Sequence, residues 1–118
     1  MAINPKDHLE ILRKNVVKSI LGVLVLQLLR SKELCGNEII SELRRRFGAV
    51  NYSHVYATLN AFVKHGLIAY GNGNGNGNGN GNGNRRICRL TEQGDLVRKQ
   101  LAQNYIDVDR HIRMCFHD

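Results

Sequence analysis

The stretch NYSHVYATLNAFVKHGLIAY, residues 51–70, decides the fold. Asn51 can cap a helix by accepting from its free backbone amides. The apolar side chains that follow recur at helical spacing: Val55, Leu59 and Phe62, with Tyr56 and Val63 beside them. Gly66 ends this helix, residues 67–70 read as a strand, and residues 86–90 read as a second strand after a loop. Helix, strand, loop and strand in this order predict the second half of a winged helix-turn-helix.

Two helices are predicted upstream. The first begins at Asn4-Pro5 and ends near residues 31–32, and it is apolar nearly all round from Ile20 to Leu29, so we expect that part at the centre of the domain. Its earlier half carries one apolar stripe: Leu9, Leu12, Val16 and Ile20. The second helix covers residues 36–47 and stops at Gly48. Its expected inward side chains are Ile39, Ile40, Leu43 and Phe47, and Arg44, Arg45 and Arg46 point outward.

A long last helix is predicted to begin after Thr91 and to extend as far as Phe116. Its apolar residues keep the alternating spacing of a coiled-coil seam: Val97, Leu101, Tyr105, Val108, Ile112 and Cys115. A helix of this length would overhang so small a domain, and its stripe needs a partner. A second copy of the chain is the simplest partner, so the first five of these residues are our candidate dimerisation residues.

With 118 residues, the chain is expected to form one domain, 1–118. We expect a mainly α protein with a small β-hairpin wing (α+β), in which residues 16–90 form the winged-helix core, 71–84 the wing loop and 91–117 the dimerisation helix. Three widely spaced cysteines predict no disulfide framework and suit a reducing cytoplasm. The apolar residues 16–29 are too few to span a bilayer, so we expect no membrane association.

The charge of the chain points to a polyanionic partner. The net charge is +7 and the isoelectric point is near 9.7. Residues 43–91 contain no Asp or Glu, so the positive excess is concentrated around the predicted recognition helix and wing. Double-stranded DNA is therefore the expected partner, and the protein is expected to be cytoplasmic and associated with the nucleoid.

The candidate DNA contacts lie on the exposed side of the third helix and at the base of the wing. On the helix they are Tyr52, Ser53, His54, Tyr56, Thr58 and Lys64, and at the wing Arg85 and Arg86. Ser53, His54 and Thr58 can reach base edges, whereas Lys64, the two arginines and the tyrosine hydroxyls can reach phosphate. The alternative is that Tyr56 belongs to the core and that the others form an ordinary solvated face. For Arg44–Arg46 two roles stay open: they contact phosphate, or they interact favourably with the helix dipole.

The wing loop is a run of seven Gly-Asn repeats, residues 71–84. It cannot contribute core and carries no charge, so an expanded or designed loop explains it better than a DNA-reading role. His111, Cys115 and His117 are too few and too close to the terminus to favour a metal site. No catalytic triad, carboxylate pair or phosphate loop is present in the sequence, and we expect neither an enzyme nor a cofactor nor a small-molecule ligand.

The sequence resembles the PadR-like winged-helix transcriptional regulators over roughly residues 18–100. The residues that carry the resemblance are Cys-Gly-Asn-Glu-Ile at 35–39, Ser-His-Val-Tyr-Ala-Thr-Leu at 53–59, His-Gly-Leu-Ile at 65–68 and Leu-Thr-Glu-Gln-Gly at 90–94. Asn37 and Cys88 stand where the family favours aromatic residues. The resemblance implies a dimeric repressor with its third helix in the major groove and its wing on the backbone or the minor groove.

The leading hypothesis is therefore a homodimeric, sequence-specific DNA-binding transcriptional regulator of the repressor type. One alternative is an architectural, plasmid-partition or replication-control DNA-binding protein of the same fold. Another is a winged helix used for protein–protein contact. The sequence alone does not identify the operator, the regulated genes or any effector.

Overall fold

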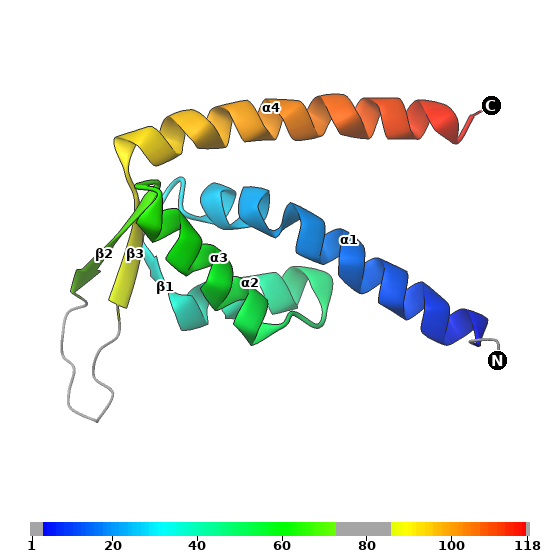
Figure 1. The fold of residues 1–118 in the computed structure, drawn as a ribbon, viewed down its shortest axis with the longest axis horizontal. Coiled ribbons are helices and arrows are strands. Elements are labelled where there is room, and N and C mark those ends of the chain that lie inside the picture. The colour runs from blue at the N-terminus through cyan, green and yellow to red at the C-terminus, as the bar shows by residue number, and fades with distance from the viewer. Residues whose placement is uncertain (1–3, 73–85, 118) are drawn as a thin grey trace.

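The computed structural model of the chain describes residues 4–72 and 86–117. Within these ranges the order of elements is α1 (Pro5–Leu28), β1 (Leu34–Cys35), α2 (Gly36–Phe47), α3 (Tyr52–Lys64), β2 (Ile68–Asn72), β3 (Arg86–Leu90) and α4 (Glu92–Cys115). Figure 1 shows α2, α3 and the strands gathered at one end of the molecule, while the two long helices α1 and α4 run out toward the other. The predicted winged helix-turn-helix is confirmed.

The hydrophobic core lies where α1, α2, α3 and the sheet meet. It is formed by Leu21, Val25, Leu26, Leu29, Leu34, Ile39, Ile40, Leu43, Val55, Leu59, Ile68 and Cys88. The second half of α1 is thus central, as its all-round apolar sequence predicts. The boundaries of α2 and β3 agree with the prediction, because each is marked by local signals such as Gly48, whose φ of 89° suits glycine.

The three strands form one antiparallel sheet in the order β1-β3-β2. Tyr70 and Leu34 both pair with Cys88 from opposite sides, so β3 is the central strand. The two-residue strand β1 was not predicted from the sequence. The expected strand 67–70 is in fact Ile68–Asn72, so that the first Gly-Asn pair belongs to β2. The rest of the wing loop, residues 73–84, and Arg85 lie outside the described residues.

The start of α4 is fixed against the hairpin by Thr91. Its Oγ1 accepts from the Gly94 amide (2.9 Å) and lies within hydrogen-bonding distance of the carbonyl oxygens of Gly66 (2.7 Å) and Leu67 (3.0 Å). The predicted cap is therefore confirmed. Gly94 is buried, and a Cβ atom at this position would overlap the Leu67 carbonyl oxygen. The first turn of α4 is thus held against the residues that follow α3, and this fixes the direction in which α4 leaves the hairpin.

The first half of α1 extends beyond the core. Its start at Asn4-Pro5 is as predicted, with the Asn4 side chain accepting from the Lys6 amide at 2.8 Å. The helix ends at Leu28, earlier than expected, with Leu29 as its cap. The stripe residues Leu9, Leu12 and Val16 remain more than half exposed. None of the helices over the described residues is both long enough and apolar enough to cross a membrane.

Candidate nucleic-acid interface

The candidate recognition helix is α3. Its first turn is capped by Asn51, whose Oδ1 accepts from the His54 amide at 3.2 Å, as the sequence predicts. Val55 and Leu59 are fully buried, and this fixes which side of the helix faces outward. The exposed residues are Tyr52, Ser53, Tyr56, Ala57, Asn60, Ala61 and Lys64. This face is uncharged except for Lys64 and contains no carboxylate, so it can approach a phosphate backbone without repulsion.

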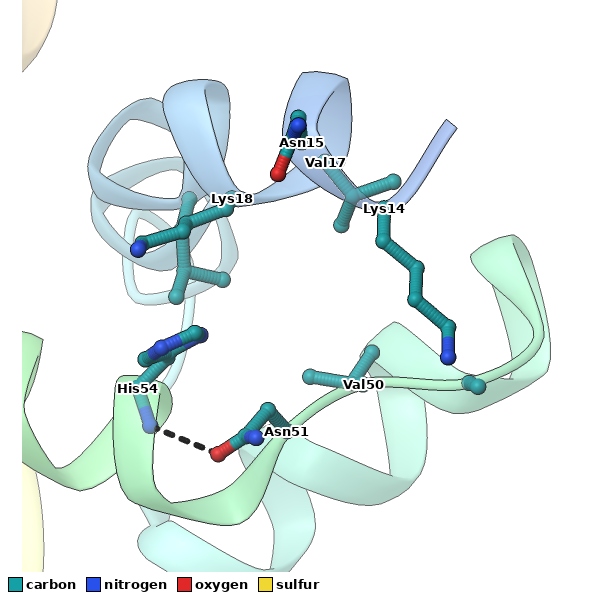
Figure 2. A pocket seen from close by; sticks show the side chains of 9 residues that line it. Lys14, Asn15, Val17, Lys18, Val50, Asn51 and His54 are labelled. Carbon is teal, nitrogen blue, oxygen red and sulfur yellow. Dashed lines mark hydrogen bonds between the residues drawn. The ribbon is translucent and has the colours of Figure 1, made fainter. Parts of the chain in front are cut away.

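His54 lies at the edge of that face and not at its centre. Its half-buried side chain lines a cavity of about 360 Å³ between α1 and the start of α3. Figure 2 shows it on the same cavity as Lys14, Lys18 and Val50, with the bond from its amide to Asn51 beneath. Contact between His54 and a base edge would therefore come from the α1 side of the helix.

Thr58 lies one turn further along the same side of α3. Its Oγ1 donates to the His54 carbonyl oxygen at 2.8 Å, and the side chain is half-buried. A hydroxyl engaged with its own helix has less capacity left for a base than a free one. Of the three residues expected to read bases, Ser53 is the one that is exposed on the described surface.

Tyr56 occupies the opposite edge of α3, against α2. Its Oη donates to Asn37 Oδ1 at 3.2 Å, and its ring lies so close to Gly36 that a Cβ atom there would be 2.7 Å from the ring. Burial, and to a lesser degree the nearby Cys35 thiol, raise the pKa of the Tyr56 hydroxyl. This side chain joins α2 to α3 while remaining partly exposed, so packing accounts for at least part of its role.

The hairpin is tied to the recognition helix through Tyr70. Its Oη donates to Asn60 Oδ1 at 3.0 Å, and the Arg86 guanidinium lies over its ring, with Cζ 4.9 Å from the centroid. The structure therefore brings Arg86, a predicted phosphate contact, alongside the exposed face of α3. Arg85 lies outside the described residues, and its predicted role stays a prediction.

At the N-terminal end of α3, a second arginine packs over a second tyrosine ring. Arg44, in the last turn of α2, has its Cζ 4.7 Å from the centroid of Tyr52, the first residue of α3. Its neighbours Arg45 and Arg46 instead pair with Glu42 Oε1 at 2.7 and 3.4 Å. The hydrogen bond from Arg45, followed by the remaining attraction of both arginines, lowers the pKa of the Glu42 carboxyl.

Two residues of this surface are not among the DNA contacts predicted from the sequence. Asn60 is one, although its spacing of seven from Ser53 places it on the same side of the helix. Arg44 is the other, because no signal in the sequence distinguishes it from Arg45 and Arg46.

The candidate dimerisation residues on α4 fall into two groups. Val97 and Leu101 are half-buried and pack against the core of their own protomer. Tyr105, Val108 and Ile112 are 41%, 54% and 48% exposed and belong to the second half of α4, which is called its overhanging part below. Figure 1 shows this half of α4 diverging from α1. Where the two helices are closer, a groove of about 340 Å³ is lined by Ile20, Val23, Leu24, Gln27, Phe47, Ala102, Tyr105 and Ile106.

The possible metal ligands of the described residues form no cluster, and the thiols differ in their exposure. Across residues 4–72 and 86–117, no three His, Cys, Asp or Glu side chains lie close enough together to hold a metal ion. Cys88 and Cys35 are buried and Cys115 is exposed. Burial raises the pKa of the Cys88 thiol to about 11, so this thiol stays protonated near neutral pH.

Comparison with known proteins identifies the fold. The model of the transcriptional regulator PadR-like family matches residues 25–100. A PadR family transcriptional regulator from Eggerthella lenta is 19% identical, with a TM-score of 0.80 and 94% of each chain covered. A PadR family regulator from Clostridium difficile is 20% identical, with a TM-score of 0.70, covering 80% of this chain and 96% of that one.

Bacillus subtilis PadR, solved in complex with operator DNA, is 22% identical with a TM-score of 0.60. The alignment covers 70% of this chain and 46% of the Bacillus protein. At these identities the solved structures establish the winged-helix fold alone. No curated protein matches the sequence.

Proposed function

The chain belongs to the transcriptional regulator PadR-like family, and from this premise we propose that it acts as a homodimeric, sequence-specific double-stranded DNA-binding protein that represses transcription. The observation that carries the proposal is the exposed face of α3, free of carboxylates and flanked by Arg44 at one end and Arg86 at the other. That the Bacillus relative is solved with operator DNA supports the choice of duplex DNA as the ligand.

In this proposal α3 enters a major groove. Ser53 and Asn60 stand on its exposed face with short polar side chains, which suit hydrogen bonds to base edges. Ala57 lies between them and Ala61 directly follows Asn60, and these small side chains allow the backbone of the helix to come close to the bases. His54 and Thr58 would contribute from the α1 side, and Lys64, Arg85 and Arg86 would contact phosphates.

The dimer is proposed to form through the overhanging part of α4. Tyr105, Val108 and Ile112 present one apolar stripe to solvent, and a second copy of this helix would cover it. Two recognition helices related by a twofold axis would read two half-sites about one helical turn apart. Repression is the proposed mode of regulation, because such a dimer would block polymerase by occupancy alone if its site lies across a promoter.

The deciding experiment is selection of bound sites from a random duplex library with the full chain, followed by footprinting on the selected site. The expected result is one palindromic site with two protected half-sites. A broad, cooperative footprint without a preferred sequence would favour an architectural or replication-control protein. Failure to bind any duplex at low salt, despite the net charge of +7, would refute the proposal and favour protein–protein contact.

A further inference from the structure

We infer that Arg44 is a DNA phosphate contact and that the ring of Tyr52 is the positioning group that aims it. The inference rests on the proposed function and adds to it a backbone contact outside both the recognition helix and the wing. It separates Arg44 from Arg45 and Arg46, which follow it directly in the sequence.

The first argument is the pairing of the three arginines. Arg45 and Arg46 share the carboxylate of Glu42, with nitrogen–oxygen distances of 2.7 and 3.4 Å. Within the part of the chain that the structure describes, no carboxylate pairs with Arg44. Arg44 thus differs from its two neighbours in having no carboxylate partner on the described residues, so a phosphate would not have to compete with an ion pair for its guanidinium.

The second argument is the geometry of the stack. With Cζ 4.7 Å from the Tyr52 centroid, the guanidinium of Arg44 is within the range of a cation–π contact. Such a contact uses the face of the guanidinium, whereas its five N–H donors lie in the plane. The stack therefore restrains the side chain without consuming the donors that bind a phosphate in bidentate fashion.

The third argument is the position of this stack relative to the hairpin. Tyr52 is the first residue of α3, and Asn60, which holds Tyr70 beneath Arg86, comes eight residues later. Eight residues of helix measure about 12 Å along its axis. The two arginines are thus held near opposite ends of the exposed face of α3, and each can contact a phosphate at its own end.

A purely structural explanation is that Arg44 only complements the dipole at the end of α2 and covers the Tyr52 ring. That role would affect folding stability but not the number of ions released on DNA binding. The salt dependence of affinity separates the two roles, because each phosphate contact contributes about 0.9 to the slope of log K against log salt.

The test uses the full chain and the duplex obtained by site selection. Affinity is measured over a series of salt concentrations for wild type, Arg44→Ala, Arg44→Lys and the matched controls Arg45→Ala and Arg46→Ala. We expect Arg44→Ala to weaken binding about tenfold at low salt and to reduce the slope by about 0.9. Arg44→Lys should keep most of the slope, and the two controls should lose clearly less than Arg44→Ala.

The role of Tyr52 is tested by Tyr52→Phe and Tyr52→Leu, alone and combined with Arg44→Ala. Phenylalanine keeps the ring under Arg44 and removes only the hydroxyl, which is a candidate phosphate contact in its own right, so Tyr52→Phe is the reference for leucine. Tyr52→Leu should bind several-fold more weakly than Tyr52→Phe. In the Arg44→Ala background the two should bind nearly alike, because the group that the ring positions is gone. Thermal melts of every variant show whether a loss of binding comes from loss of fold.

The outcomes separate the inference from the function on which it rests. A wild-type protein that binds no duplex overturns the proposed function and the inference with it. A wild type that binds DNA, together with an Arg44→Ala slope equal to its own, overturns only the Arg44 contact. If the effects of Tyr52→Leu and Arg44→Ala are additive, Tyr52 does not position Arg44. If Arg45→Ala loses as much binding as Arg44→Ala, Arg44 is not distinct from its neighbours.

Discussion

The hydroxyl of Tyr70 donates a hydrogen bond to the Oδ1 atom of Asn60 across 3.0 Å, so the hairpin is joined to the exposed face of the candidate recognition helix. The same Tyr70 ring lies under the Arg86 guanidinium. One side chain thus sets the relation between a group expected to read bases and a group expected to bind phosphate.

Replacing Tyr70 should separate these two contributions. Tyr70→Phe keeps the ring under Arg86 but removes the bond to Asn60, which should lower the free energy of unfolding by about 1 kcal/mol. Tyr70→Leu removes the ring as well as the hydrogen bond to Asn60. It should weaken DNA binding more than Tyr70→Phe does and reduce the slope of log K against log salt. Urea denaturation and salt-dependent binding measure the two effects. Equal binding by Tyr70→Leu and wild type would show that the stack does not position Arg86 for DNA.

Sequence preference should depend most on the centre of the exposed face of α3. We expect Ser53→Ala and Asn60→Ala to relax selection at particular base pairs, each with a loss of about 1–3 kcal/mol against the preferred base. His54→Ala and Thr58→Ala should also change preference, but less, because both side chains are half-buried on the α1 side. Repeating the site selection with each variant measures this. A consensus unchanged by all four replacements would mean that α3 does not read bases.

Helices whose ends are marked by capping residues or glycines could be predicted from the sequence. The capping side chains of Asn51 and Thr91, together with the positive-φ glycine at Gly48, mark helix ends within one or two residues along the chain. Apolar spacing then fixed the buried side of α3. These features depend on neighbouring residues, and that is why the winged helix-turn-helix and most of its boundaries emerged without the structure.

The features that escaped prediction depend on residues far apart in the chain. The strand β1 is two residues long, and only its pairing with β3 makes it a strand. The contact between Arg44 and Tyr52, and that between Tyr70 and Asn60, require the packed arrangement of α2, α3 and the hairpin. The placement of His54 beside α1 likewise follows from helix packing and not from helical spacing.

The close approach of the Leu67 carbonyl oxygen explains why residue 94, in the first turn of α4, is a glycine. Alanine normally stabilises a helix by about 1 kcal/mol relative to glycine, but here its Cβ would overlap the Leu67 carbonyl oxygen. We therefore expect Gly94→Ala to lower the free energy of unfolding by about 2 kcal/mol or more. Gly22→Ala is the matched control, since its Cβ meets only the end of the Phe62 ring at 3.1 Å. An equal effect of the two replacements in urea denaturation would contradict the clash.

The stability of the protein should fall at high pH partly because of Cys88. Burial, and then the nearby Cys35 thiol, raise its pKa from 9.0 to about 11. A raised pKa in the folded state stabilises the fold below pH 9, and this contribution disappears as the pH rises through about 11. Cys88→Ala should therefore show a shallower loss of unfolding free energy over this window.

The control for this pH effect is Cys115→Ala, because Cys115 is exposed. It should leave the pH dependence unchanged. Part of the fall should remain in Cys88→Ala, since burial also raises the pKa values of Tyr56 and Tyr70. A Cys88→Ala variant whose stability falls as steeply as that of wild type would exclude Cys88 as a source.

The proposed dimer is best tested on the overhanging part of α4. Leu101 packs against the core of its own protomer, so its replacement would lower folding stability as well as any association. Val108 and Ile112 are about half exposed, and lysine at either position should place a charge in the proposed seam and give monomers. Gln103→Lys is the control, because helical spacing puts Gln103 on the opposite side of α4. Sedimentation velocity measures the mass of each variant, and DNA binding should weaken together with dimerisation. A dimer mass retained by both the Val108→Lys and Ile112→Lys variants would rule out this seam.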